Sequence, residues 1–454
     1  MLDHPRWFLA AAFLVAAVAL AGCGGETCGD ACTRGLSCTA VVDASDDEEL
    51  AEAVGEATRG TCIALAAGTS GEVTLPAGVS LLGADSAKTT VGTVTIPAGS
   101  GALVRGLHVA GVVKLEPDAV DVRLERLLVT GSKNGIQADA RASFTVADSV
   151  LSGVPEVSVL AIDSARVTVQ RTTIENGAGP GVWVQCSAGC DCATPPVVEL
   201  DTVTVRRAAH GGVVLVGSSA TLTGVSIVDT QAGADFQGGG GLSASECSHL
   251  AAKALTVGGS LGYGVLLDGA SADLGGGGDE VGIIIVNSRG GGLYVQNTGD
   301  GQPVSIANTT LTGNSAVGLH LASETTGIII VNSKIEKTQL ASVPAEGWVG
   351  ANKAPIGSAD VGDGLIWGFG AAAQIDGLEL SDNARNAALI DGPVGAGSSI
   401  ANVTLGGTDA AKGIEQQHVS SPAEAPSTSN APAIAQSAAS PDATPVPPAG
   451  PNAI

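Results

Sequence analysis

Aromatic residues and positive charges are both scarce in this chain of 454 residues. It has 4 Trp, 2 Tyr and 5 Phe, although 44% of its residues are hydrophobic. A core in such a chain must be built from Val, Ile, Leu and Ala, which favours thin layers of β-structure. The chain has 21 Lys and Arg against 45 Asp and Glu, a formal net charge of −24, with no basic cluster. We therefore expect no nucleic-acid partner, because contacts to phosphates need grouped Lys and Arg.

The chain also lacks a long apolar run, and its one notable apolar segment is short and lies near the start. Residues 7–20 are apolar and follow Arg6, a pattern that is too short for a typical membrane span and suits a signal peptide over residues 1–22. The run ends in Leu-Ala-Gly before Cys23, which resembles the bacterial lipobox. That resemblance implies lipid attachment to Cys23, and Gly24 in place of Asp implies the outer membrane. The alternative is an ordinary signal peptide followed by a disulfide cysteine.

The middle of the chain contains an internal repeat. Segments 122–129, 144–151 and 167–174 carry apolar residues at their first, third and eighth places. The eighth-place residues of successive segments are 22 and 23 residues apart. The register extends from Val104 to Leu405, with Ile285 at a third place and Gly290 interrupting the eighth. Gly-rich or Asn-rich turns lead from each repeat into another strand of period two. Three short strands in each turn predict a parallel solenoid over residues 63–419.

The repeat resembles the right-handed parallel β-helix family with the pectate-lyase-like architecture, over roughly residues 63–417. Asparagines at the fifth place, where a left-handed backbone is favoured, look similar to the internal asparagine ladders of that family: Asn287, Asn308, Asn332 and Asn402. The resemblance implies an all-β, single-stranded β-helix. It carries no catalytic residue over, because the polygalacturonase-type motifs are missing; for example, His210 follows Ala rather than Gly.

Both ends of the solenoid have distinct sequences. Ser45 and Glu48 form a capping-box pattern before apolar residues at helical spacing, so residues 45–62 are expected to form an amphipathic N-terminal cap, with Gly60 as its stop. Residues 420–454 contain 8 of the 20 prolines and neither Lys nor Arg. This composition predicts a disordered tail.

Eight cysteines remain after Cys23, an even number that predicts disulfides in an exported chain. One group begins in a leader over residues 23–44, and the other lies mid-chain: Cys28, Cys32, Cys38 and Cys62, then Cys186, Cys190, Cys192 and Cys247. Insertions at 185–197, 243–250 and 268–282 fall at one corner of the solenoid. Because coils are spaced by about 4.8 Å, Cys247 is expected to pair with one of the three other mid-chain cysteines, while the remaining two pair locally.

A candidate ligand face follows from the outward positions of the second strands. These positions carry the predicted binding residues Trp183, Gln185, Asp268, Tyr294, Gln296 and His320. Exposed aromatic rings beside amides suit sugar stacking and hydroxyl recognition, so an extended glycan or other surface polymer is the expected ligand.

These outward positions do not favour catalysis. Asp268 lacks a nearby carboxylate for a glycosidase, and neither Arg nor Lys is present among them to stabilise charge in a lyase. We therefore expect a non-catalytic cell-envelope lipoprotein without a metal or cofactor. The alternatives are a divergent polysaccharide lyase, hydrolase or epimerase that uses Asp268 or His320, and a structural or adhesive rod. The acidic residues at 268, 273, 279 and 280 leave a calcium site open, although they lack the spacing of a known calcium loop.

Overall fold

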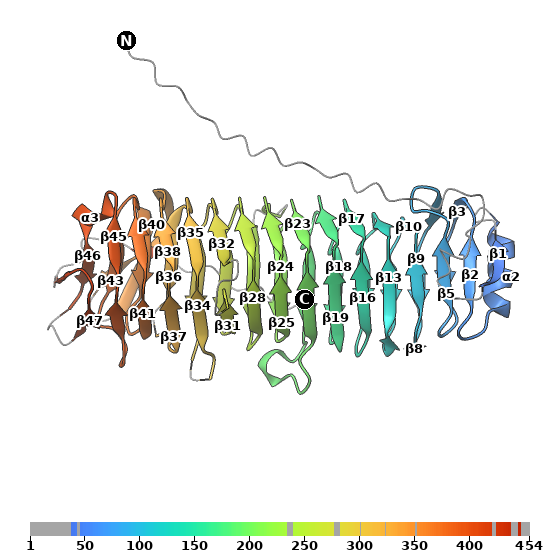
Figure 1. Cartoon of the computed structure of the whole chain (residues 1–454), viewed down its shortest axis with the longest axis horizontal. Coiled ribbons are helices and arrows are strands. Elements are labelled where there is room, and N and C mark those ends of the chain that lie inside the picture. The colour runs from blue at the N-terminus through green and yellow to red at the C-terminus, as the bar shows by residue number, and fades with distance from the viewer. Residues whose placement is uncertain are drawn as a thin grey trace, which may run out of the picture.

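The described residues form a rod of stacked β-coils, with β1 (Cys38–Val42) and α2 (Asp47–Glu56) at one end and β46 (Ile414–Gln417) and β47 (Ser427–Ser429) at the other (Figure 1). The computed structural model describes residues 38–42, 46–233, 239–276, 282–299, 301–322, 324–349, 352–419, 424–436 and 444–445. Each complete coil gives one short strand to each of three sheets, and strands within a sheet pair in parallel and in register. The predicted all-β fold, a right-handed parallel β-helix, is thereby confirmed.

The three sheets are named here in the order in which the chain visits them. The first sheet contains β1 (Cys38–Val42), β2 (Cys62–Leu65), β5 (Ser80–Gly83), β9 (Leu103–Arg105), β13 (Val122–Glu125), β16 (Ser143–Ala147), β19 (Arg166–Gln170), β22 (Val197–Asp201), β25 (Ser219–Thr223), β28 (His249–Lys253), β31 (Ser271–Leu274), β34 (Val304–Ala307), β37 (Ile328–Val331), β41 (Ala373–Asp376), β44 (Ser399–Ala401) and β47 (Ser427–Ser429). The second sheet contains β3 (Gly68–Ser70), β6 (Thr89–Val91), β10 (His108–Val109), β14 (Leu128–Val129), β17 (Val150–Ser152), β20 (Thr173–Glu175), β23 (Thr204–Arg206), β26 (Ser226–Val228), β29 (Thr256–Gly258), β32 (Ile283–Val286), β35 (Thr309–Thr312), β38 (Lys334–Glu336), β42 (Glu379–Ser381) and β45 (Thr404–Gly406).

The third sheet closes each coil. It contains β4 (Val73–Thr74), β7 (Val94–Ile96), β11 (Val113–Leu115), β15 (Ile136–Ala138), β18 (Val159–Ile162), β21 (Val182–Gln185), β24 (Gly211–Val216), β27 (Gly240–Ser245), β30 (Val265–Asp268), β33 (Leu293–Gln296), β36 (Ala316–Leu321), β40 (Asn352–Trp367), β43 (Ala388–Asp391), β46 (Ile414–Gln417) and β48 (Ile434–Gln436). A small pair, β8 (Gly99–Ser100) and β12 (Ala119–Val120), lies at a corner.

The core is a continuous column of aliphatic side chains inside the coils. On β13, for example, Val122 and Leu124 are buried and pair with Phe144 and Val146 of the next coil, while the residues between them face outward. Each coil therefore buries its alternate residues against the coils on both sides, as a solenoid requires.

One coil differs from the predicted register. Ile285 lies on β32 of the second sheet, where it pairs with Val257 and Leu311, so it occupies the eighth place of the repeat and not the third. Leu274 on β31 holds the third place, and its side chain is fully buried. Residues 275–282 connect these two strands and make this repeat longer than its neighbours. The sequence prediction therefore assigned the third place to Ile285 instead of Leu274. The interruption assigned to Gly290 is therefore wrong.

From β9 onward, and outside the coil that holds the insertion at 275–282, the chain turns after the first sheet at a residue with a left-handed backbone. Asn308, Asn332 and Asn402 have φ angles of 49°, 46° and 50° there, in line with the expected role of asparagine. Asn430 extends this row by donating from Nδ2 to Oδ1 of Asn402 at 2.9 Å. Asn287 also has a positive φ of 56°, but it follows a strand of the second sheet and belongs to another corner.

The N-terminal end is capped by a helix, α2 (Asp47–Glu56), whose Leu50 and Ala53 are buried. Its N-cap is Asp46 rather than the expected Ser45, since the Asp46 carboxylate accepts hydrogen bonds from the backbone N–H groups of Glu48 and Glu49. Asp and Ser are comparable N-caps, so the sequence pattern alone did not distinguish them. The helix ends at Glu56, with Ala57 as its C-cap, before Gly60.

The C-terminal end continues past residue 419. Within residues 424–436, which the sequence assigns to the tail, β47 and β48 pair with β44 and β46 and add part of a further coil. Beneath it, the short helix α3 (Asp409–Lys412) carries a fully buried Asp409, which accepts hydrogen bonds from the backbone and side chain of Asn383. Backbone pairing needs no apolar pattern, so a polar segment can extend a solenoid.

The mid-chain cysteines form the predicted arrangement. Cys190 is bonded to Cys247 across two coils, and Cys186 is bonded to Cys192 within one loop that contains a 3₁₀ turn, η1 (Gly189–Asp191). Cys62 is also disulfide-bonded. Residues 1–37, with the predicted lipidation site Cys23 and with Cys28 and Cys32, lie outside the described residues, and Cys38 is described only in its backbone.

A hairpin that the repeat did not predict projects from the third sheet. Strand β39 (Ala341–Val349) pairs antiparallel with the first part of β40, from Asn352 to Val361, before β40 joins the sheet. A short strand near the C-terminus, β49 (Thr444–Pro445), pairs with β39. The base of this hairpin contributes to a second apolar cluster on the outside of the third sheet.

Candidate binding groove

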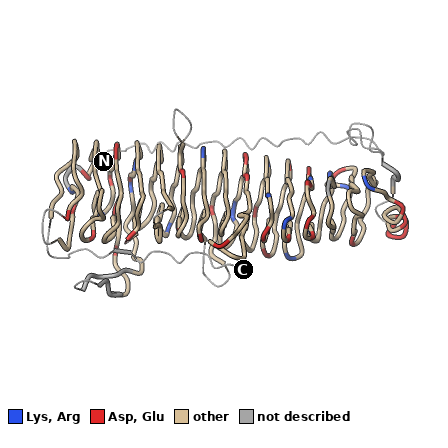
Figure 2. Tube along the Cα trace, turned by 90° about the horizontal axis from the view of Figure 1, so that it is seen from below, with Lys and Arg blue, Asp and Glu red and all other residues tan. Residues whose placement is uncertain are grey.

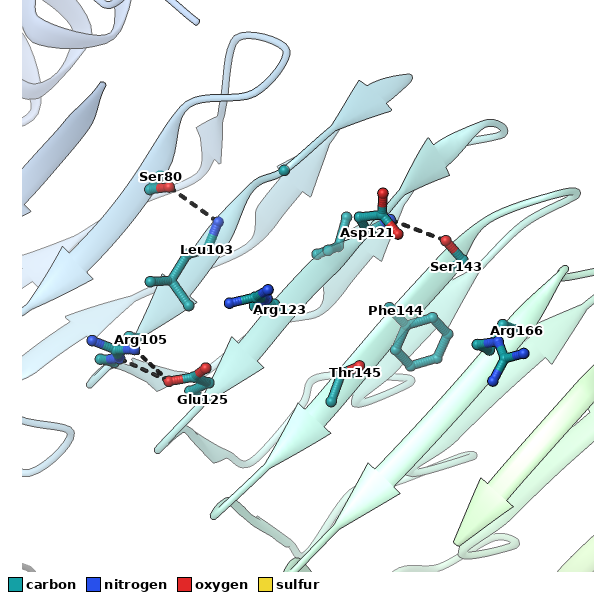
Figure 3. Close-up of a pocket in the computed structure, with 12 residues that line it drawn as sticks. Ser80, Leu103, Arg105, Asp121, Arg123, Glu125, Ser143, Phe144, Thr145 and Arg166 are labelled. Carbon is teal, nitrogen blue, oxygen red and sulfur yellow. Dashed lines mark hydrogen bonds and ion pairs between the residues drawn. The ribbon is translucent and has the colours of Figure 1, made fainter. Parts of the chain in front are cut away.

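The outer face of the first sheet is hollowed in its N-terminal third. A hollow of about 690 Å³ lies over five neighbouring strands, β5, β9, β13, β16 and β19 (Figure 3). It is lined by Ser80, Gly101, Leu103, Arg105, Asp121, Val122, Arg123, Glu125, Ser143, Phe144, Thr145 and Arg166. Five strands at a spacing of about 4.8 Å extend over about 19 Å along the rod.

A second hollow of about 300 Å³ continues the first toward the carboxyl ends of the strands. The two share Arg123, Glu125 and Thr145, and the second also reaches Arg126, Ala147, Asp148, Gln170 and Arg171. We call the two hollows together the arginine groove. It crosses several coils, so it can contact a chain-like ligand at successive points along the rod.

The alternation of β13 explains how charged residues come to line this groove. Val122 and Leu124 enter the core, which forces Arg123 and Glu125 to the outer face. Arg126 follows at the left-handed corner, with a φ of 52°, and its side chain is exposed.

Most charged side chains of the groove are held in ion pairs with the next coil. Nε of Arg105 donates to Oε2 of Glu125 at 3.0 Å, and Nε of Arg171 donates to Oδ1 of Asp148 at 2.7 Å. The hydrogen bond and charge of Asp148 raise the pKa of Arg171. At the other edge, Arg166 donates to Glu199 at 2.5 Å.

Arg123 and Arg126 differ from these neighbours. Across the described residues, neither side chain makes a hydrogen bond or an ion pair, and both are exposed. By contrast, the other arginines between residues 105 and 207 all have a carboxylate or amide partner: Arg105, Arg141, Arg166, Arg171, Arg206 and Arg207. The groove therefore presents two unpaired guanidinium groups to solvent.

The charge of the chain is unevenly distributed along the rod. Residues 101–210 hold 10 of the 21 Lys and Arg and 12 of the 45 Asp and Glu, so this quarter of the chain is nearly neutral while the whole carries −24. Acidic residues dominate elsewhere, as on helix α2 at the right-hand end of Figure 2. The groove thus lies where an anion meets the least repulsion from the protein.

Four of the predicted binding residues are not exposed. Gln185, Tyr294, Gln296 and His320 are buried, with exposed fractions of 1%, 3%, 7% and 2%. The Tyr294 hydroxyl donates to the carbonyl of Gly290 at 2.7 Å, and its ring packs edge-on against His320. The expected open aromatic face around these residues is therefore wrong.

For Tyr294, the physical reason is the unforeseen hairpin. Val361 lies at its base, and Ala341 and Val343 belong to β39; these residues pack with Leu266, Tyr294 and Ile366 on the outside of the third sheet. Alternation along a strand shows which side chains leave the core. It does not show whether another part of the chain then covers them.

The other two predicted binding residues are partly exposed but engaged. Trp183 donates from Nε1 to Oε1 of Gln185 at 2.9 Å, and Asp268 accepts a hydrogen bond from Nδ2 of Asn297. Trp183 and Asp268 lie on β21 and β30, separated by β24 and β27, so they do not form one site.

The described part of the chain contains no group of three or more His, Cys, Asp or Glu side chains placed to hold a metal ion. Its helices are also too short or too polar to cross a membrane.

The sequence did contain a signal for the arginine groove. In the repeat that begins at Val122, Arg occupies the second and fifth places, and Thr145 and Thr168 hold the second place in the next two coils. The ligand face predicted from the sequence lies on strands of the third sheet, whereas these places lie on the first sheet. That face is also not free of positive charge, because Lys114 of β11 pairs in register with Gln137 and lies in the same outward row as Trp183.

No protein-family model matches this chain, and no curated protein matches it either. Among solved structures, it is similar to tailspike protein 3 of bacteriophage CBA120, with 13% identity and a TM-score of 0.47 over 88% of this chain and 61% of that one. It is also similar to the N-terminal fragment of gene product 12 of bacteriophage Phi29, with 10% identity and a TM-score of 0.42 over 83% and 87% of the two chains.

A third similar structure is the A-module of the mannuronan C-5 epimerase AlgE4 from Azotobacter vinelandii. The identity is 15% and the TM-score 0.33, over 90% of this chain and 96% of that module. Likenesses at this level concern the parallel β-helix fold. They carry no argument about what this chain binds, so its function has to be argued from the groove.

Proposed function

We propose that this protein is an exported, lipid-anchored β-helix that binds an extended anionic polymer along the arginine groove without reacting with it. The observation that carries the proposal is the pair of unpartnered side chains, Arg123 and Arg126, in a groove whose other arginines are paired. A guanidinium group binds carboxylate or phosphate through two parallel hydrogen bonds, and it is always charged at neutral pH.

The negative charge of the whole protein restricts where an anionic polymer can bind. A chain with a net charge of −24 repels polyanions in general, so an anionic ligand is held only where cations outweigh nearby acids. Glu125 and Asp148 are neutralised by Arg105 and Arg171, so the two positive charges of Arg123 and Arg126 outweigh the one remaining carboxylate of the groove, that of Asp121.

The ion pairs also favour binding over catalysis. A glycosidase needs two carboxylates that are free to act as acid and base or nucleophile. Glu125 and Asp148 are instead each held by an arginine, and their charges are committed to that pair. The alternative of a divergent lyase, hydrolase or epimerase is therefore the less supported one.

The proposed attachment to the cell envelope rests on the lipobox-like residues before Cys23. Lipid on Cys23 would hold the rod at the membrane by its N-terminal end, with outer-membrane sorting as expected for Gly24. Metabolic labelling with a fatty-acid analogue tests this. The wild-type protein should be labelled and should fractionate with the outer membrane, and Cys23→Ser should lose the label.

Binding is tested with a soluble protein that begins after Cys23, on an immobilised polyuronate and on a neutral glucan. The double variant Arg123→Ala/Arg126→Gly should weaken polyuronate binding at least tenfold, since each charge-assisted contact contributes about 1.5–3 kcal/mol. Glycine suits position 126 because its φ is positive. Wild-type affinity should also fall as salt is raised, because the interaction is screened.

A matched control removes the same charge elsewhere. Arg141 is paired with Asp118 and has a positive φ of 59°, and Arg289 is exposed outside the groove, so Arg141→Gly/Arg289→Ala should bind as the wild type does. Equal losses in both double variants would mean that only net charge matters, and the groove would be rejected. Mass spectrometry of the same samples should detect no released oligosaccharide; fragments would replace the binding role with an enzymatic one.

A further inference from the structure

The two edges of the arginine groove have opposite character. At the amino ends of the strands lie Asp121 and Ser143, whereas the cations Arg123 and Arg126 lie at the middle and at the carboxyl end of β13 (Figure 3 labels the first three). Successive outward residues of a strand are about 6.6 Å apart, so one ligand can touch both edges at once.

Asp121 is held in place through its backbone while its carboxylate stays open. Its N–H donates to Oγ of Ser143 at 3.0 Å, and its φ of 55° fixes it at the corner before β13. The carboxylate itself makes no hydrogen bond or ion pair to the described residues, and the side chain is exposed. Arg166 lies on the same edge, but Glu199 neutralises it.

The chemistry of the two edges differs accordingly. A free carboxylate repels an anionic group and accepts strong hydrogen bonds from hydroxyl groups. A pair of guanidinium groups attracts anions. The groove is therefore suited to a chain that is anionic along one side and carries hydroxyl groups along the other.

Resting on the proposed function, we propose that Asp121 is a specificity-determining residue that selects a carboxylated polysaccharide. A uronic acid ring carries its carboxylate on one edge and free hydroxyl groups on the opposite edge. Bound along the rod, its carboxylates face Arg123 and Arg126, and its hydroxyl groups face Asp121 and Ser143. A polyphosphate carries charge on every side, so Asp121 repels it.

The test compares two probes on the same soluble protein, a polyuronate and an inorganic polyphosphate of similar charge. The measured quantity is the ratio of the polyphosphate Kd to the polyuronate Kd, which should exceed one for the wild type. Asp121→Asn removes the charge, and Asn also tolerates a positive φ. It should lower the ratio about tenfold, by strengthening polyphosphate binding and weakening polyuronate binding.

Asp273→Asn is the matched control. Asp273 is exposed on the same sheet, on β31, six strands from β13 and hence about 29 Å away, and the substitution changes the net charge equally. Its ratio should equal that of the wild type. A ratio that falls equally in both variants, or that is unchanged in Asp121→Asn, would overturn the role of Asp121.

The double variant at positions 123 and 126 separates this inference from the proposed function. If it loses both probes while Asp121→Asn leaves the ratio unchanged, the groove binds anions but Asp121 does not select among them. If it retains both probes, the groove is not the binding site, and the proposed function fails together with the inference.

Discussion

Arg105 and Glu125 face each other on the adjacent strands β9 and β13, where Nε of Arg105 donates to Oε2 of Glu125 at 3.0 Å. Glu125 lies between Arg123 and Arg126 in sequence and is the groove carboxylate next to both. Its engagement by Arg105 keeps it from neutralising them. The anion affinity of the groove therefore depends on a residue that need not touch the ligand.

This pair gives the first prediction. Arg105→Ala should release Glu125 toward Arg123 and weaken polyuronate binding several-fold. Because the side chains are only 9% and 20% exposed, it should also lower the free energy of unfolding by about 1–3 kcal/mol. Arg105→Ala/Glu125→Ala should restore the affinity. Binding titrations and urea unfolding of the four proteins of this cycle would measure both effects, and additive effects on affinity would contradict the coupling.

The corrected register predicts opposite outcomes for two neighbouring isoleucines of β32. Ile285 is fully buried, so Ile285→Ala should cost about 2–5 kcal/mol of the free energy of unfolding. Ile284 is 38% exposed, so Ile284→Ala should change it by less than about 1 kcal/mol. Chemical denaturation of the two variants decides the register. A larger loss at Ile284 would mean that this strand is shifted by one residue.

The two mid-chain disulfides should contribute unequally to stability. Cys190 and Cys247 are separated by 57 residues and Cys186 and Cys192 by 6, so the first bond constrains a longer loop of the unfolded chain. Loop-closure entropy gives about 4 kcal/mol for the first and about 2 kcal/mol for the second. Thermal unfolding of the two double Cys→Ser variants should rank them in that order, and equal losses would contradict this account.

The chain has two tyrosines, and both titrate above the ordinary value of 10.0. Burial raises the pKa of Tyr263 to about 12 and raises that of Tyr294 further. A raised pKa means that the folded state keeps the proton that the unfolded state loses, so this contribution is complete below pH 10 and declines as the pH rises above it.

We therefore expect stability to fall from pH 10 upward, with tyrosinate absorbance rising only as the protein unfolds. Tyr294→Phe should lose about 1 kcal/mol at neutral pH, since the hydrogen bond to Gly290 disappears, but should be less sensitive to alkali. Absorbance that rises at pH 10 while circular dichroism is unchanged would show that the rings are accessible.

The pattern of apolar residues within each repeat was sufficient to predict the fold, because every coil of a solenoid places its side chains in the same way. Alternation placed residues such as Leu124 and Val146 inside, and a period near 22 residues set the coil. The pattern failed where residues 275–282 lengthen a corner, since a shift in register is invisible without the pairing of Ile285 with Leu311. The cap showed the same limit on a smaller scale, with Asp46 in place of Ser45.

The sequence by itself determined the column of aliphatic residues, the order of the coils and which side chains leave the core, because each depends on neighbours in the same or adjacent repeats. Tertiary structure decided which outward faces remain open. The hairpin base buries Tyr294 and its neighbours, and ion pairs between coils occupy Arg105 and Arg171 but not Arg123. Such coverage depends on groups brought together from different coils, and no local periodicity records it.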